Sequence, residues 1–305
     1  MTSATLDQPV KAPTFQGVST RRKLTDHFAT VLVTASVVVA LVPLVWVLYT
    51  VVAKGIGAVT SSTWWLYSQS GMTAFAAGGG AYHAIVGSLL QAAVCAVISI
   101  PVGVFVGIYL VEYAGGSRMG KVTTFMVDIL TGVPSIVAAL FIYALWVATF
   151  GFERSGFAVS LALVLLMIPV IVRSTEEMLR IVPMDLREAS YALGVPKWKT
   201  IAKIVVPTAL SGIVTGILLS LARVMGETAP LLILVGYSQA INFDMFSGFM
   251  GSLPGMMFDQ TSAGAGANPV PTDRLWGAAL TLVVLIAALN IGARFLAKFF
   301  APKKV

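Results

Sequence analysis

Charge is scarce in this sequence. Only 11% of its 305 residues are Asp, Glu, Lys or Arg, whereas 57% are hydrophobic. This composition leaves too little polar surface to cover a soluble globule, so a soluble globular domain is excluded. The excess apolar area must face lipid, and in lipid a helix satisfies all its backbone hydrogen bonds within itself. We therefore predict an all-α integral membrane protein.

Cysteine and histidine are nearly absent, which limits disulfide and metal chemistry. The single Cys95 excludes an internal disulfide and a thiolate metal cluster, and we interpret it as a small buried hydrophobe. His27 and His83 are far apart in the sequence, so a shared metal site is not expected. The sequence also has no nucleophile beside a base, so we predict no catalytic residue and no metal site.

A nucleotide-binding loop is absent as well. The segment Gly115–Lys121 has the spacing GxxxxGK, but Val122 stands where Ser or Thr would hold magnesium, and the segment joins two apolar helices. We therefore expect the chain to bind no cofactor of its own. Energy for any transport must come from a partner or from an ion gradient.

Long apolar runs are abundant and predict six transmembrane helices. A spanning helix needs roughly 20 apolar residues, and runs of that length lie at 28–53, 82–111, 122–150, 157–182, 208–236 and 275–298. These runs make up a transmembrane domain at 28–300, with a polar tail at 1–27, a short tail at 301–305 and long connecting loops at 55–81 and 237–274.

Basic residues predict the orientation, because they favour the cytoplasmic side of the membrane. With the N-terminus inside, the cytoplasmic segments hold 15 Lys and Arg residues and the exterior segments hold three. We therefore expect both termini in the cytoplasm and the loops 55–81 and 237–274 outside. The asymmetry, together with anionic lipid, explains the net charge of +7, so nucleic acid is not expected as a partner.

Two further features concern the shape of the helices and the outer surface. Prolines within the predicted spans predict kinks, among them Pro101, Pro134, Pro169 and Pro230. The second exterior loop carries apolar residues that predict a short amphipathic helix, namely Phe243, Met245, Phe246, Phe249 and Met250. Such a helix either receives an external partner or lies in the lipid headgroups.

The segment between the fourth and fifth spans predicts a helical hairpin. Asp185 followed by Glu188 has capping-box spacing and starts a helix around Leu186. Gly194 supplies the left-handed turn that ends this helix, and Pro196 suits the first position of a second one. The second helix carries Trp198, Ile201 and Val205 on one face. A solvated basic loop would not need this succession of signals.

This segment resembles the EAA loop of permeases from ATP-binding-cassette (ABC) importers. The resemblance rests on Glu188, Ala189, Gly194, Ile204 and Pro207, with Ser190 in place of the usual second alanine and Val206 in place of the usual leucine. It implies the six-helix fold of a type I ABC importer permease. The loop at 184–207 would then insert into a cleft of a cytoplasmic ATPase.

Three further stretches narrow the resemblance to PstA-type permeases of the phosphate-specific importer. They lie at 128–137, 173–180 and 222–232. The resemblance implies a heterodimer with a PstC-type permease, a PstB-type ATPase dimer that binds ATP and Mg²⁺, and a PstS-type phosphate-binding protein. It also implies a location in the bacterial plasma membrane and inorganic phosphate as cargo.

Charges inside the predicted spans are the candidates for the substrate pathway. Arg223 and Glu227 lie one turn apart in the fifth span, where they can form an ion pair. The pair either lines a water-filled pathway or holds two helices together. Arg173 is a second pathway candidate, and Glu176 and Arg180 have the spacing of a surface ion pair. We also include Asp128 and Glu177, while Asp128 and Glu112 are alternatively helix-end or interhelical partners.

An arginine offers a planar fork of donors that suits an oxyanion. The prediction is therefore a non-catalytic permease subunit of an ATP-driven phosphate importer. A permease for another oxyanion and an ion-coupled secondary transporter are the alternatives. The secondary transporter would not explain the hairpin.

Overall fold

The computed structural model describes residues 19–300, with side chains described to Phe295. It divides into a first unit that ends at Thr50 and a second unit from Val51 onward. The predicted tail 301–305 and most of the predicted tail 1–27 lie outside the described residues. Residues 20–27 already belong to the first helix.

The regular elements of the described range are helical. In chain order they are α1 (Thr20–Val59), α2 (Ser62–Leu66), α3 (Tyr82–Ile108), η1 (Tyr109–Tyr113), α4 (Arg118–Thr131), α5 (Ser135–Ile142), η2 (Tyr143–Thr149), α6 (Gly156–Ile181), α7 (Met184–Ala192), α8 (Lys197–Thr200), η3 (Ile201–Val205), α9 (Val206–Met225), α10 (Ala229–Leu234), α11 (Leu253–Ser262) and α12 (Pro269–Phe300). The three η segments are π-helical turns continuous with the preceding helices.

Among the described residues, five helices are long and apolar enough to cross a membrane, and the number is six if the bent pair of helices is counted as one span. This number agrees with the predicted six spans, but the third span differs from the expected continuous helix. Helix α4 ends at Thr131, and α5 departs at 106° after a short break. Pro134 lies in that break and not inside a helix, which corrects the predicted kink.

The other three predicted kink positions, Pro101, Pro169 and Pro230, do not all lie inside helices. Pro101 and Pro169 lie inside α3 and α6, as predicted. Pro230 lies in the first turn of α10, where its missing N–H is not needed, and so it starts a helix instead of kinking one. The fifth span is therefore also interrupted, between Met225 and Ala229.

Helix α6 is the centre of the second unit. It packs most extensively against α3 and α9, and each of these two helices presents a pair of glycines to it. A Cβ at Gly103 would lie 2.7 Å from Cβ of Ile171, and one at Gly107 would lie 2.8 Å from Cβ of Thr175. The missing side chains therefore let α3 approach α6 closely, as small-residue pairs do in membranes.

Helix α9 repeats this arrangement on α6. A Cβ at Gly212 would lie 2.1 Å from the sulfur of Met178, and one at Gly216 would lie 2.4 Å from Cβ of Ser174. Because both flanking helices use glycines four residues apart, the three helices form a tightly packed layer. This layer carries the hairpin at one end.

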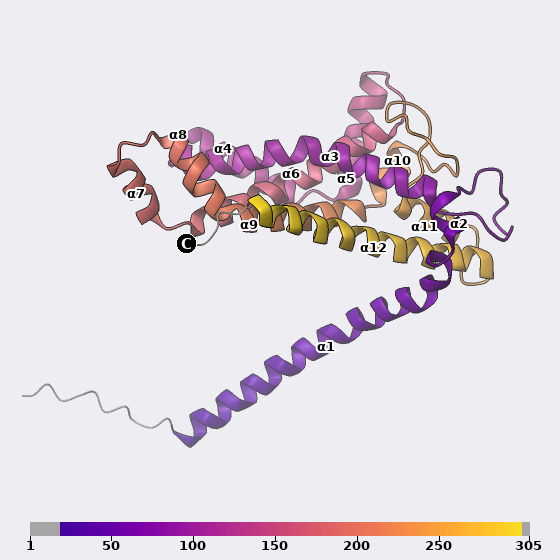
Figure 1. Ribbon diagram of the computed structural model, residues 1–305, viewed down its shortest axis with the longest axis horizontal. Helices are drawn as coiled ribbons and strands as arrows, with labels where there is room; N and C mark the ends of the chain where they lie inside the picture. The colour runs from indigo at the N-terminus through magenta and orange to yellow at the C-terminus, as the bar shows by residue number, and fades with distance from the viewer. Residues whose placement is uncertain (1–18, 301–305) are drawn as a thin grey trace, which may run out of the picture. The chain divides into compact units, whose positions relative to one another are not determined.

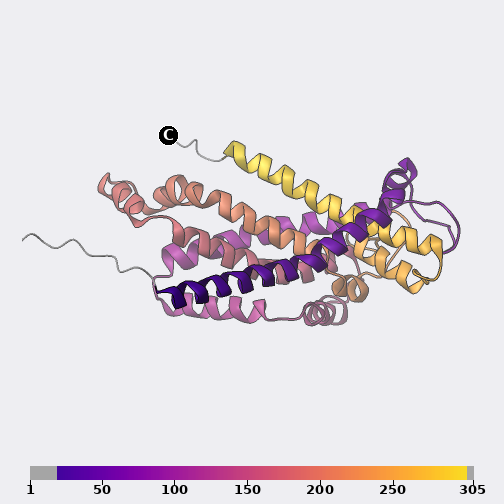
Figure 2. The ribbon, with the colours of Figure 1, turned by 90° about the horizontal axis from the view of Figure 1, so that it is seen from below.

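Helices α7 and α8 lie at one end of the second unit, and α2 and α11 lie at the opposite end (Figure 1). Figure 2 shows the same arrangement from below, with the orange-red hairpin at the left and the loops around α2 at the right. The second unit therefore has two different ends, joined by the long helices α3, α6, α9 and α12.

The end that carries α2 and α11 is held together by buried side chains. Arg274 donates to the carbonyl oxygens of Ala74, Ala76 and Gly78 at 3.3, 2.7 and 2.9 Å. Trp64 donates its indole N–H to the hydroxyl of Thr281 at 2.8 Å. These bonds attach the predicted exterior loop 55–81 to α12.

The predicted amphipathic helix in the loop 237–274 is wrong in its position. Residues 237–252 form irregular backbone, and the helix of this loop is α11, from Leu253 to Ser262. Asp244 accepts hydrogen bonds from the N–H of Phe246 and the hydroxyl of Ser247, at 2.8 and 2.7 Å. A side chain that bonds its own local backbone favours a turn over a helix at this position.

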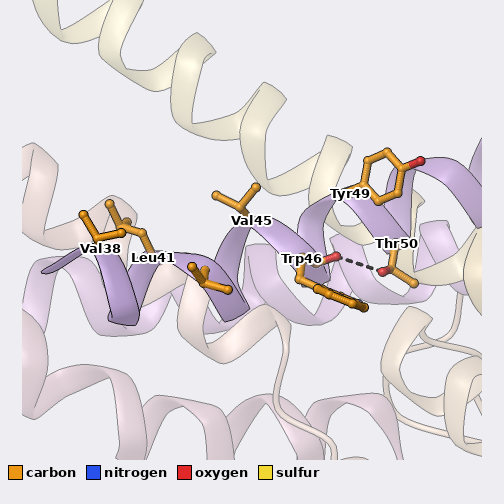
Figure 3. A pocket seen from close by; sticks show the side chains of 7 residues that line it. Val38, Leu41, Val45, Trp46, Tyr49 and Thr50 are labelled. Atoms are coloured by element: carbon orange, nitrogen blue, oxygen red, sulfur yellow. Dashed lines mark hydrogen bonds between the residues drawn. The ribbon is translucent and has the colours of Figure 1, made fainter. Parts of the chain in front are cut away.

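The first unit consists of α1 up to Thr50, and its side chains are exposed along its length. Figure 3 shows Val38, Leu41, Val45, Trp46 and Tyr49 along this helix. The hydroxyl of Thr50 donates to the carbonyl oxygen of Trp46 at 2.8 Å and so is satisfied within the helix. An apolar helix of this kind is suited to lipid or to another apolar protein surface.

Candidate coupling hairpin and translocation site

Helix α7 forms the first arm of the hairpin. It begins at Met184 after Pro183, two residues earlier than the predicted start. No side-chain cap forms at its N-terminus, so the predicted capping box of Asp185 and Glu188 is wrong. The fixed φ of a proline is sufficient to set the start of a helix. Asp185 still lies in the first turn, where a carboxylate complements the helix dipole.

The bend between the two arms agrees with the prediction. Gly194 has φ of +75°, in the left-handed region, and Pro196 precedes α8. The hydroxyls of Ser190 and Thr200 are buried and lie 2.8 Å apart, which joins the two arms. Ser190, the departure from the usual alanine, therefore has a structural role in this chain.

The second arm is continuous with the fifth span. Helix α8 passes through η3 into α9 without a break in the helical backbone. Ile201 and Val205 are buried, but Trp198, expected on the same face, is 65% exposed. Ile204 and Pro207 are partly buried in the same continuous helix.

The hairpin presents an exposed surface that contains the matched loop residues. Glu188 and Ala189 are exposed on α7, and Leu193 at the bend is 83% exposed. Exposed large apolar side chains at a capped bend are typical of a contact surface for another protein. The second arm connects this surface to α9 through continuous helical backbone.

An ion network crosses from α4 to α6 near the same end of the bundle. Arg173 forms ion pairs with Asp128 of α4 and, at 2.7 Å, with Glu176 of its own helix. Glu176 also pairs with Arg180 at 2.6 Å, so the predicted pair is confirmed, but Glu176 is buried and not on the surface. A cavity of about 350 Å³ lies beside the network and includes Lys121 in its lining.

This network changes what can be expected of Arg173. Its charge is matched by two carboxylates, and so it joins α4 to α6 in the described state. Glu177 is exposed on α6 and has no role in the network. The pathway roles of Arg173, Asp128 and Glu177 stay predictions.

Arg223 and Glu227 are not on one continuous helix, contrary to the expectation of a pair one turn apart. Helix α9 ends at Met225, so Arg223 lies in its last turn and Glu227 lies in the following break. No ion pair joins the two among the described side chains. Arg223 is exposed and Glu227 is partly buried. The guanidinium therefore has no carboxylate of its own in the described range.

Glu227 instead lies among polar side chains that the sequence reasoning missed. A cavity of about 10 Å³ includes Ser88, Gln91, Ser252 and Glu227 in its lining. The side-chain nitrogen of Gln91 is buried and has no hydrogen-bond partner. Ser88 and Gln91 lie three residues apart in an apolar span, and this spacing of polar residues could have indicated the site.

The two interrupted spans meet in the core. Helices α5 and α10, which follow the breaks in the third and fifth spans, pack against each other. Their contact includes Ala138, Ala139 and Ile142 of α5 with Leu231 and Leu234 of α10, all within one buried cluster. Interrupted helices at membrane depth are tolerated where protein covers them or where they line a cavity, and they mark binding sites in transporters.

Comparison with known proteins identifies the family. The sequence model described as "Binding-protein-dependent transport system inner membrane component" matches residues 99–305. The phosphate transport system permease protein PstA 1 of Mycobacterium tuberculosis H37Rv is 54% identical over 306 residues, which is 100% of this chain and 97% of that protein. PstA of Pasteurella multocida is 39% identical over 285 residues, covering 93% and 96%.

Solved structures give the same fold. A chain of the bacterial alginate ABC transporter, in complex with an alginate-bound periplasmic protein, aligns with a TM-score of 0.64 and 11% identity, covering 92% of this chain and 97% of that chain. A chain of the inward-facing MetNI methionine ABC transporter aligns with a TM-score of 0.55 and 18% identity, covering 73% and 95%. The chain belongs to the inner membrane components of binding-protein-dependent transport systems, and within them to the PstA family of phosphate transport system permease proteins.

Proposed function

We propose that this chain is a permease subunit of an ATP-driven importer of inorganic phosphate. The observation that carries the proposal is the similarity over the full length of the chain to proteins named phosphate transport system permease protein PstA. The chain is a multi-pass protein of the bacterial inner membrane and forms part of the pathway without catalysing a reaction.

The hairpin is the proposed contact with the motor. An ATPase of the PstB type, present as a dimer, would bind ATP and Mg²⁺ and grip the exposed surface around Glu188, Ala189 and Leu193. Because α8 continues into α9, rotation of the gripped surface would move the fifth span directly. This assignment places the hairpin and both termini in the cytoplasm, as the basic residues predict.

The remaining partners complete the pathway. A PstC-type permease would supply the second wall, and a PstS-type protein would deliver phosphate at the end that carries α2 and α11. Arg223 is the proposed cation for the passing anion, because it is exposed within an apolar span and the described ion pairs leave it unmatched. Glu227 adds selectivity, since phosphate at neutral pH has a proton to donate and sulfate has none.

Uptake of labelled phosphate tests the pathway residues. We expect Arg223→Gln and Glu227→Gln to reduce uptake in a deletion strain that carries the whole transporter. Arg118→Gln is the control, because Arg118 is an exposed arginine at the start of α4 that is absent from the described ion pairs. If both pathway variants take up phosphate at the native rate, the pair has no part in translocation.

The hairpin contact is tested separately. Gly194 and Gly151 both have positive φ, +75° and +74°, and no atom lies within 4 Å of an added Cβ at either position. Valine at either site therefore imposes a similar backbone strain. We expect Gly194→Val to abolish uptake and weaken co-purification of the ATPase, while Gly151→Val retains both. Equal behaviour of the two variants would contradict a gripping role for the bend.

A further inference from the structure

A buried ion pair joins the hairpin to a helix that is distant in the sequence. Arg187 of α7 donates through Nη2 and Nε to Oε1 of Glu112, at 2.8 and 3.2 Å. The two side chains are 9% and 6% exposed, whereas each other ion pair of the described residues includes a partner that is at least 30% exposed. Two charges removed from water in this way require good geometry to remain stable.

The same guanidinium also holds the end of α6. It donates to the carbonyl oxygens of Val182 and Leu179, at 2.7 and 3.0 Å. Val182 is the C-cap residue of α6, and Leu179, in its last turn, also accepts from the N–H of Val182. Arg187 therefore joins three elements: α7, the end of α6, and η1 at the end of the second span.

The second arm of the hairpin reaches the same place. Lys197, the first residue of α8, donates to the backbone carbonyl oxygen of Glu112, and its ammonium lies 4.9 Å from the centre of the Tyr113 ring. Each arm thus contacts η1. The contact point is a π-helical turn, a local irregularity that is frequent at functional sites.

The hairpin has limited apolar packing at this point. A cavity of about 530 Å³ lies beside the pair, with Met184 and Tyr191 among the residues that line it. On this side of the hairpin, Arg187 and Lys197 add polar contacts to η1, beside the apolar packing of Val111 against the cluster that contains Val182 and Val205. Removal of the ion pair would leave Lys197 of the second arm as the remaining polar contact between the hairpin and η1 among the described residues.

We propose that Glu112 and Arg187 are positioning residues that transmit the movement of the hairpin to the second span. The proposal rests on the proposed function, in which an ATPase moves the hairpin. Helices α6 and α9 follow the hairpin through covalent continuity, but α3 has no such link. The pair supplies it, and the close packing of α3 on α6 lets the three helices move as one body.

The pair is tested in the complete transporter, with its ATPase and binding protein, reconstituted into proteoliposomes. The measured quantity is the amount of phosphate imported per ATP hydrolysed. We expect Glu112→Gln to lower this ratio about tenfold, the effect of losing a hydrogen bond between charged groups, while the ATPase stays bound. The control is Arg180→Gln, because Arg180 lines the same cavity but forms its ion pair with Glu176 of its own helix.

A double-mutant cycle separates the pair from two independent contributions. We expect Arg187→Gln to lower the ratio as Glu112→Gln does, and the double variant to lower it no further. If Glu112→Gln does not assemble, Glu112→Asp retains the charge with a shorter reach, and we expect it to assemble with a reduced ratio.

Two outcomes overturn the positioning role: a native ratio in an assembled Glu112 variant, or single effects that multiply in the double variant. A native transporter that hydrolyses ATP and imports no phosphate would refute the proposed function instead. The two failures are therefore distinguishable.

Discussion

The close contact between α3 and α6 predicts how far a larger side chain at Gly107 would destabilise the protein. At Gly107 an added Cβ would lie 2.8 Å from both Cβ and Cγ2 of Thr175 and 3.2 Å from the carbonyl oxygen of Val172. Carbon atoms in good contact are about 3.5–4.0 Å apart, so the helices would have to separate by about 1 Å. We expect Gly107→Val to destabilise the protein by about 2–3 kcal/mol, because overpacking of this kind costs up to about 3 kcal/mol and helix propensity returns only a few tenths.

The control for this variant is Gly292→Val in α12, where no atom lies within 4 Å of the added Cβ. The chain is purified in detergent and unfolded with increasing mole fractions of SDS, and helicity is followed by circular dichroism. We expect a lower midpoint for Gly107→Val and a nearly native midpoint for Gly292→Val. Equal midpoints would refute the close approach of α3 and α6.

A second-site change tests the contact directly. Thr175→Gly removes the two atoms that the new side chain would meet. We expect the double variant to have a higher SDS unfolding midpoint than Gly107→Val, although Thr175→Gly alone lowers the midpoint. Such a non-additive result is the mark of residues in contact. Purely additive effects would mean that the loss in Gly107→Val does not come from contact with Thr175.

Two further predictions concern the end of the molecule that carries α2 and α11. Burial raises the pKa of Tyr237 above its ordinary value of 10.0. The folded state therefore holds this proton more tightly than the unfolded state, so the free energy of unfolding falls as pH rises above about 10. Tyr237→Phe has no such proton, and we expect denaturant titrations of this variant to show a smaller fall over the same pH range. Arg274→Met removes three bonds to the loop at residues 74–78, so we expect faster proteolytic cleavage there, with native helicity; an unchanged cleavage rate would contradict the anchoring role.

Much of the hairpin could be predicted because its signals are local. Gly194 supplied the left-handed turn and Pro196 stood in front of the second arm, as the sequence indicated. The capping box failed for an equally local reason, since Pro183 starts α7 before Asp185 can act as a cap. Backbone preferences of glycine and proline act within a few residues, and so they survive folding unchanged.

Partners of charged residues could not be predicted in the same way. Arg187 was only one of several basic residues in the loop, but it is the one that pairs with the carboxylate of Glu112, 75 positions earlier. Arg173, expected to face the pathway, pairs with Asp128 of another helix. Helical spacing identifies neighbours on one helix, whereas contacts between helices depend on how the bundle packs.

The interrupted spans share a sequence pattern that hydrophobicity alone does not include. Hydrophobicity did not reveal the breaks, because each of the runs 122–150 and 208–236 is apolar enough as a whole to be predicted as one span, even with Glu227 at the second break. The prolines alone do not reveal them either, because Pro101 and Pro169 stay inside helices. Both breaks begin with a glycine that caps the preceding helix, Gly132 before Pro134 and Gly226 before Pro230.

The effects of glycine and proline add at each of the two breaks. Glycine costs about 1 kcal/mol relative to alanine within a helix, and proline removes a backbone donor within the next turn. Pro101 and Pro169 have no glycine in the four positions before them, and their helices continue. In a membrane the freed backbone groups need protein around them, and the packing of α5 on α10 provides it at both breaks. A glycine two to four residues before a proline in an apolar run therefore indicates an interrupted span, and in this chain it identifies the two segments where the helices part inside the bundle.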